Sequence, residues 1–149
     1  MQLWQQIIIT VYGLLALIAF VTSINACYYH KKSFEETPLY GFLFSGFVRA
    51  DNVVFGLFWF LTSLLCFILQ DWTLFLLILS SFWLIRSIGE TFYWFLQQFH
   101  PREGNPPEKF WYFRIFHNDS VWFVNQIYWQ CVTVITLITT IYLSVLWLK

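Results

Sequence analysis

Four long apolar runs separated by polar segments dominate the hydrophobic pattern of the chain. They cover approximately residues 3–26, 52–70, 72–99 and 120–148. A helix needs about 20 apolar residues to cross a bilayer, and each run reaches or approaches that length. Pro101 follows the third run and ends it, because proline cannot continue a helix. The pattern therefore predicts four membrane-spanning helices.

The first run has to be told apart from a cleaved signal peptide. No basic residue precedes it, and its apolar stretch is longer than the core of a signal peptide. We therefore interpret it as a real span.

The connections between the runs differ greatly in length. Only Gln70 to Trp72 separate the second run from the third, which predicts a tight antiparallel pair. The two longer connections end in the aromatic, amphiphilic pieces LYGFLFSGFVR and FWYFRIFH, which are suited to the headgroup layer. The expected fold class is all-α: one integral membrane four-helix bundle over residues 1–149, with short interfacial segments before helices 2 and 4.

Composition supports a membrane class. The chain is 59% hydrophobic, 23% aromatic and only 11% charged, with a mean hydropathy of +0.63. Soluble domains carry about 25% charged residues, and a core of 149 residues cannot hide so much apolar surface from water. Lipid must solvate the excess. The net charge of zero gives no electrostatic reason to expect a nucleic-acid partner.

The basic residues gather on two of the connections. Because basic residues favour the cytoplasmic side, the two long connections are predicted to lie there, with both termini and the Asp71 turn outside. Lys149 alone opposes this orientation. The chain lacks eukaryotic retention or lipidation signals, which favours the bacterial inner membrane. The basic residues on the long connections are Lys31, Lys32, Arg49, Arg102, Lys109 and Arg114.

Polar residues inside the last two spans are the candidate functional residues. Arg86 and Glu90 are four apart, so they share a helix face and can pair. An unpaired Arg or Glu in a span costs roughly 2.5–3.5 kcal/mol. With a rise of about 1.5 Å per residue, Glu90 is expected at the level of Gln126 or Gln130, and Arg86 near Gln130 or Thr133. The candidate ligand-binding set is Arg86, Glu90, Trp94, Gln97, Asn125, Gln126, Trp129 and Gln130.

Two hypotheses account for this polar-aromatic face. The ion pair and the amides could be packing contacts that fix how the last two spans meet, since interhelical polar contacts are common in membranes. Alternatively, the face could line a cavity that receives an amphiphile or a small solute, since charges inside spans mark functional sites. The tryptophans beside it favour a pocket, because tryptophans at membrane interfaces would lie only at the ends of spans.

Catalytic and metal chemistry find little support. There is no G-x-S-x-G motif, and the three cysteines contain no C-x-x-C pair. His100 with Glu103, and His117 with Asp119, have spacings that could ligate a metal, but such spacings are generic. No histidine lies within a predicted span, so haem between helices is not expected. We expect no cofactor and no metal.

The sequence therefore favours a small multi-pass membrane protein without catalytic activity, which binds an amphiphile or a partner protein through the face between helices 3 and 4. One alternative is a subunit of an oligomeric transporter or channel, in a homo-oligomer or a larger membrane complex. A second alternative is a small membrane enzyme acting on a lipid headgroup.

Overall fold

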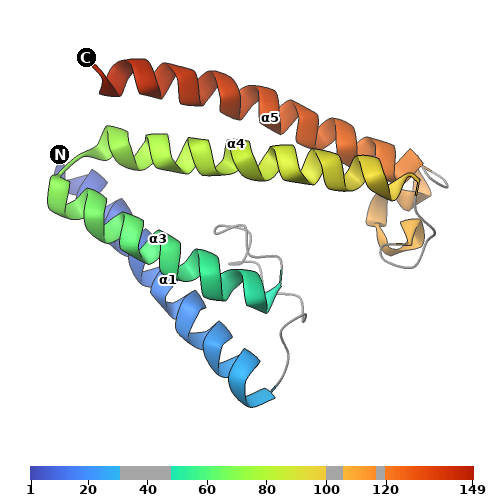
Figure 1. Ribbon diagram of the computed structural model, residues 1–149, viewed down its shortest axis with the longest axis horizontal. Coiled ribbons are helices and arrows are strands. Elements are labelled where there is room, and N and C mark those ends of the chain that lie inside the picture. The colour runs from blue at the N-terminus through green and yellow to red at the C-terminus, as the bar shows by residue number, and fades with distance from the viewer. Residues whose placement is uncertain (31–47, 100–105, 117–119) are drawn as a thin grey trace. The chain divides into compact units, whose positions relative to one another are not determined.

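The fold is all-α, as predicted. The computed structural model describes residues 1–30, 48–99, 106–116 and 120–149 (Figure 1). Within these residues lie four long helices, each long and apolar enough to cross a membrane, and two short 3₁₀ helices that precede the last of them. The elements are α1 (Leu3–His30), α3 (Arg49–Leu69), α4 (Trp72–Gln97), η1 (Pro107–Lys109), η2 (Trp111–Arg114) and α5 (Ser120–Trp147).

The helix bounds agree closely with the predicted spans. The largest difference is at the end of α1, which continues past the predicted residue 26 to His30. Tyr28 and Tyr29 in this extension are polar-tipped aromatics that need not stop a helix, so hydropathy alone placed the end too early. The interfacial segment predicted before the second span lies outside the described residues. Before the fourth span, the described part of the connection forms η1 and η2.

Two residues end α3 and begin α4. Gln70 adopts a left-handed backbone conformation with φ 55° and ψ 30°, which is the usual way to end a helix. The Asp71 carboxylate then accepts a hydrogen bond of 3.0 Å from the backbone N–H of Leu74. This satisfies one of the free donors at the start of α4. The short connection that the sequence predicted is therefore built from a C-cap and an N-cap.

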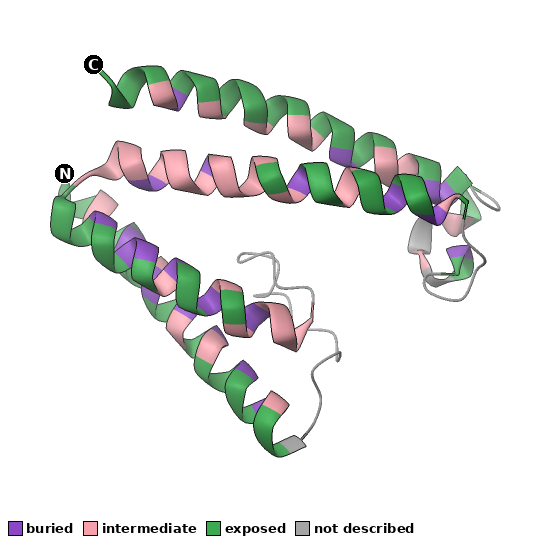
Figure 2. Ribbon diagram, in the orientation of Figure 1, coloured by how far each residue is buried: buried purple, intermediate pink, exposed green. Residues whose placement is uncertain are grey.

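The chain forms two compact units, Met1–Phe75 and Leu76–Lys149. In the first unit, α1 and α3 pack as an antiparallel pair through buried residues, most of which are small (Figure 2). On α1 these residues recur every three or four positions, so they form one stripe. The buried residues are Ile9, Gly13, Ala16, Ala19, Ser23 and Ala26 on α1, and Asn52, Gly56, Trp59, Thr62, Ser63 and Cys66 on α3.

Two glycines set how closely α1 and α3 approach. A Cβ atom added to Gly56 would lie 2.9 Å from the Ala16 carbonyl oxygen, and one added to Gly13 would lie 2.9 Å from the Ser63 Cβ. Close backbone approach through small residues is a common way to pack helices in membranes, where no hydrophobic force acts between them. The α1–α3 contact is therefore a backbone-to-backbone packing.

Polar and aromatic contacts hold one end of this pair together. The Gln6 side-chain amide donates a hydrogen bond of 2.7 Å to the Gln70 side-chain oxygen. Near them, the Trp4 and Trp72 rings meet edge to face with centroids 5.4 Å apart. Amphipathic rings of this kind suit the membrane–water interface.

Candidate functional site

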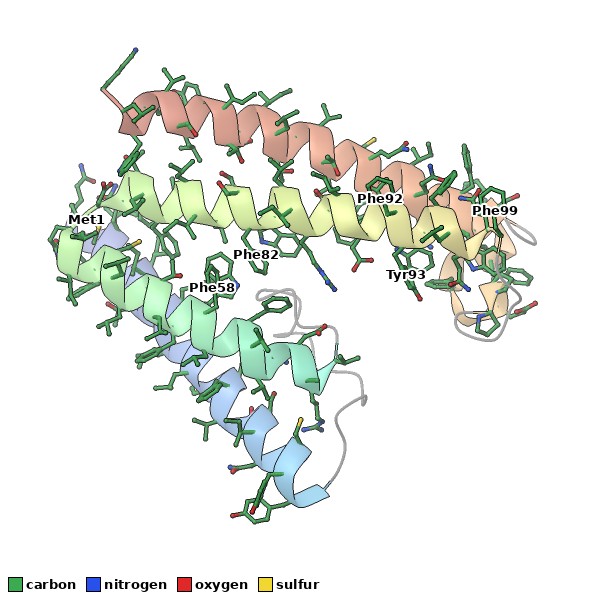
Figure 3. The ribbon with its side chains drawn as sticks, viewed as in Figure 1. Met1, Phe58, Phe82, Phe92, Tyr93 and Phe99 are labelled. Atoms are coloured by element: carbon green, nitrogen blue, oxygen red, sulfur yellow. The ribbon has the colours of Figure 1, made fainter. Side chains whose placement is uncertain are left out.

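Arg86 and Glu90 form an ion pair on α4, as the sequence predicted. An Arg86 guanidinium nitrogen lies 3.0 Å from a Glu90 carboxylate oxygen. The side chains are 27% and 15% exposed, respectively. Because the two groups neutralise each other, the pair places a strong dipole, but no net charge, on this helix. Figure 3 shows Phe82 and Tyr93 pointing from one side of α4, with Phe92 on the other.

The contact between α4 and α5 is made by hydroxyl groups. The Thr133 hydroxyl donates to the Ser87 hydroxyl at 3.0 Å, and the Thr140 hydroxyl donates to the Ser80 hydroxyl at 3.1 Å. Each serine in turn donates to a backbone carbonyl of its own helix. We call these four residues the α4–α5 seam. It runs antiparallel, as four spans with these connections require.

The amide contacts that the structure describes run to partners other than the ion pair. The Gln98 side-chain amide donates to the Gln126 oxygen at 2.6 Å, while Asn125 donates to the backbone carbonyl of Val121 at 3.1 Å. Gln130 is exposed. The pairing of Arg86 and Glu90 with the amides of α5 therefore stays a prediction. Successive residues of a helix turn by about 100°, so a seam through Ser87 places Arg86 to one side of it.

The tryptophans of the candidate set are buried, in contrast to Gln130. Trp94 lies one turn beyond Glu90 and meets Phe110 edge to face, with ring centroids 5.6 Å apart. Its indole nitrogen is buried and has no hydrogen-bond acceptor in the part of the chain that is described. Trp129 on α5 is also buried, and so is Gln97 near the end of α4. The structure thus places Trp94 and Gln97 next to the ion pair along one helix.

The sequence also held a signal for the seam. Ser80 and Ser87 are seven residues apart, and so are Thr133 and Thr140. A repeat of seven residues marks the face along which two helices cross at a shallow angle. Arg86 and Glu90 are conspicuous in the sequence because of their charge, whereas hydroxyl groups, including that of Ser87 next to Arg86, make the contact between the helices.

A metal site was a minor possibility. Among the described residues, no group of three His, Cys, Asp or Glu side chains lies close enough to hold a metal ion. The histidines considered for this role, His100 and His117, lie outside those residues together with Glu103 and Asp119.

No protein-family model, curated protein or solved structure matches the chain. Its four apolar helices and nine tryptophans make it a small, tryptophan-rich, multi-pass integral membrane protein. Any more specific role has to be argued from its own side chains. The distinctive group is the Arg86–Glu90 pair with Trp94 and Gln97, which we call the charged face of α4. It offers a cation, an anion and an indole N–H donor within three turns of one helix.

Proposed function

We propose that the protein binds a zwitterionic amphiphile through the charged face of α4 and has no catalytic activity of its own. The observation that carries this proposal is the ion pair inside a membrane-spanning helix, partly exposed and one turn from a buried indole N–H donor. Ionisable groups inside spans are expensive and are usually kept because a ligand or partner uses them.

The hydroxyl seam supports a binding role for the Arg86–Glu90 ion pair over a packing role. Two Ser–Thr contacts and the Gln98–Gln126 bridge already join α4 to α5. Gln126 and Thr133, the residues expected to receive the charges, are engaged in these contacts instead. The helices therefore have a means of pairing that does not depend on the ion pair.

The chemistry of the face favours a zwitterion over an ion. Arg86 and Glu90 together carry no net charge, so an anion alone would meet repulsion from the carboxylate. A headgroup with a phosphate and an ammonium can place each charge against its opposite. Charge-assisted hydrogen bonds of this kind are about twice as strong as neutral ones, and the low dielectric around them strengthens both contacts.

Native mass spectrometry of the purified protein tests the proposal. We expect phosphatidylethanolamine to bind more tightly than phosphatidylglycerol with the same acyl chains. Both Glu90→Gln and Arg86→Gln should weaken the binding of phosphatidylethanolamine by roughly tenfold or more, the effect of losing one hydrogen bond to a charged group. Lys149→Gln, which removes a charge outside the face, should leave binding unchanged.

The exchanged variant Arg86→Glu/Glu90→Arg serves as a folding control, because it keeps an ion pair at this level. Equal binding of the two lipids by the unmodified protein, or unchanged binding in Glu90→Gln, would refute the proposal. Localisation in a bacterial inner membrane, with both termini outside, belongs to the same proposal and rests on the distribution of basic residues.

An oligomeric subunit is the second candidate, and Gln130 is the observation that favours it. This amide is exposed on α5, ten residues or about 15 Å from the helix start. Glutamine side chains at such depth hydrogen-bond across helices. We expect Gln130→Leu to weaken self-association in detergent, measured by analytical ultracentrifugation, while Thr139→Val on the same helix should not. A monomer at all protein concentrations would exclude this candidate.

A further inference from the structure

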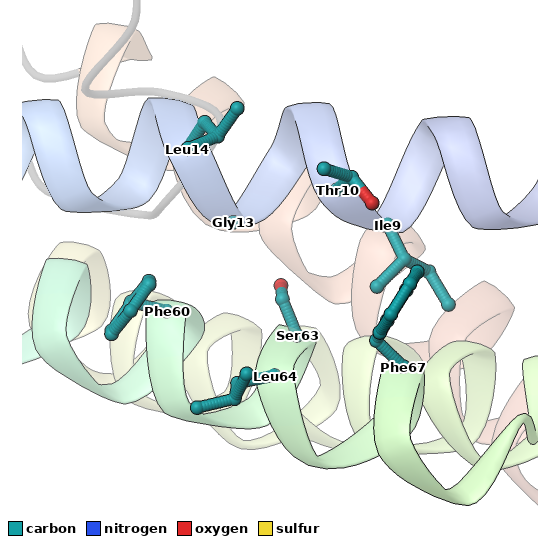
Figure 4. A pocket seen from close by; sticks show the side chains of 8 residues that line it. All are labelled: Ile9, Thr10, Gly13, Leu14, Phe60, Ser63, Leu64 and Phe67. Carbon is teal, nitrogen blue, oxygen red and sulfur yellow. The ribbon is translucent and has the colours of Figure 1, made fainter.

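The first unit contains a cavity that the charged face does not explain. It has a volume of about 240 Å³ and lies between α1 and α3. Figure 4 shows its lining, which comes from both helices. The walls are apolar apart from two hydroxyl groups. The lining residues are Ile9, Thr10, Gly13, Leu14, Phe60, Ser63, Leu64 and Phe67.

Ser63 gives the cavity a polar group without a partner. The residue is only 3% exposed, and its hydroxyl oxygen has no hydrogen-bond partner within the described chain. Thr10 on the opposite helix instead bonds to the carbonyl of Gln6 at 2.8 Å. In Figure 4 the Ser63 hydroxyl points from α3 toward Gly13 of α1. A buried polar group that makes no hydrogen bond carries an energetic cost, which a ligand oxygen would remove.

Gly13 allows the Ser63 hydroxyl to lie close against α1. A Cβ atom at this position would lie 3.4 Å from the Ser63 hydroxyl oxygen and 2.9 Å from its Cβ. Any larger residue would therefore clash with Ser63 and force the two helices to shift. The cavity and its single donor thus depend on the same small-residue packing that joins α1 to α3.

Exposed side chains surround the mouth of the cavity. Thr10, Leu14, Leu64 and Phe67 are all exposed, and the two helices are long enough to span the membrane. Ser63 is six residues, or about 9 Å, from the end of α3. That end carries the Trp4–Trp72 contact and the Gln6–Gln70 bridge, which suit the headgroup layer. A ligand group at Ser63 therefore lies among acyl chains, where a charged headgroup does not go.

We propose that this cavity binds an uncharged ring compound with a carbonyl oxygen, dissolved in the membrane, of the ring-ketone or quinone class. The carbonyl accepts a hydrogen bond from Ser63, and the ring packs between Phe60 and Phe67. An apolar cavity of about 150 Å³ takes up benzene, so the larger volume here has room for a substituted ring. The site is separate from the charged face of α4.

Photolabelling of the full chain in phosphatidylcholine liposomes tests this proposal. Benzophenone is a neutral aromatic ketone that attaches to nearby C–H bonds when irradiated, and mass spectrometry locates the attachment. We expect adducts to concentrate on Leu14, Leu64 and Phe67. Fluorenone, which has a carbonyl group, should displace them, whereas fluorene, which has the same rings without the oxygen, should not.

Two pairs of variants distinguish the effect of the Ser63 hydroxyl from the effect of the cavity volume. Ser63→Ala should reduce labelling of the cavity about threefold, as expected for one hydrogen bond in a membrane; Ser23→Ala removes a buried serine of α1 that does not line the cavity and should have no effect. Leu64→Trp fills the mouth of the cavity and should abolish labelling there. Leu65→Trp adds the same volume at an exposed position outside the lining and should not.

Circular dichroism of each variant confirms that the helices are intact before labelling is compared. The proposal fails if labelling is uniform over the lipid-facing residues, if fluorene competes as well as fluorenone, or if Ser63→Ala changes nothing. Because the charged face of α4 is not altered in these variants, the outcome is independent of zwitterion binding.

Discussion

At the scale of single residues, glycine has opposite roles in the two units. Gly56 faces the backbone of α1, where an added methyl group would lie 2.9 Å from the Ala16 carbonyl oxygen. Gly89 on α4 has nothing within 4 Å of the same position. One glycine is required by packing, whereas the other only raises the flexibility of the unfolded chain.

This contrast gives a matched pair of substitutions. Gly56→Ala should lower the free energy of unfolding by about 1–3 kcal/mol, because the neighbouring backbone cannot move aside easily. Gly89→Ala should raise it by about 0.5–1 kcal/mol, since alanine favours the helix. Reversible unfolding in mixed detergent micelles measures both. Equal effects of the two substitutions would show that α1 and α3 are less tightly packed than the structure indicates.

The contacts of single side chains can be predicted from the sequence within one helix but not between helices. Spacing alone predicted that Arg86 and Glu90 would pair, because residues four apart always face the same way on a helix. It could not assign the partner of Gln126. The partner of Gln126 depends on which side of α4 faces α5. If α4 were rotated about its axis by one residue, Arg86 would lie at the contact in place of Ser87.

At the scale of helices, the two units use different contacts. The α1–α3 pair brings backbones together through glycine, alanine and serine. The α4–α5 pair is joined by side chains that reach across: two Ser–Thr contacts and an amide bridge. The positions and lengths of all four helices could be predicted, because hydropathy over about 20 residues is a strong signal. Their contacting faces were harder to predict, because lipid-facing and helix-facing positions are both apolar.

The seam can be tested by a double-mutant cycle. Thr133→Val and Ser87→Ala should each destabilise the protein, and the double variant should show a coupling energy of about 0.6 kcal/mol, the average for such contacts in membranes. Thr139→Val serves as the control, since within the described chain the Thr139 hydroxyl bonds to the Ile135 carbonyl of its own helix and to no other helix. Additive effects of Thr133→Val and Ser87→Ala would mean that the two hydroxyls do not interact in the membrane.

At the scale of the whole molecule, the distribution of charge predicts the orientation. Arg49 opens α3 and Arg114 ends η2, on the two connections that carry most of the basic residues. Such residues hold a connection on the cytoplasmic side. The short turn at Gln70 and Asp71 carries no basic residue, so we expect it to lie on the opposite side.

Fusions to the C-terminus measure this orientation. We expect alkaline phosphatase fused after Lys149 to be active, because it folds only outside the cytoplasm, and green fluorescent protein at the same site to be dark after export in unfolded form. Fusions placed in the long first connection should give the reverse pattern. A fluorescent C-terminal fusion would invert the proposed topology.

The bridge between Gln98 and Gln126 has a consequence for how the last two helices align. The two Ser–Thr contacts repeat at the same interval on both partners, so a slide of α5 by one heptad would still keep one of them, Ser80 with Thr133 or Ser87 with Thr140. Either slide loses the other Ser–Thr contact and also the hydrogen bond between Gln98 and Gln126. The amide bridge near the helix end therefore widens the preference for the observed alignment over its two shifted neighbours.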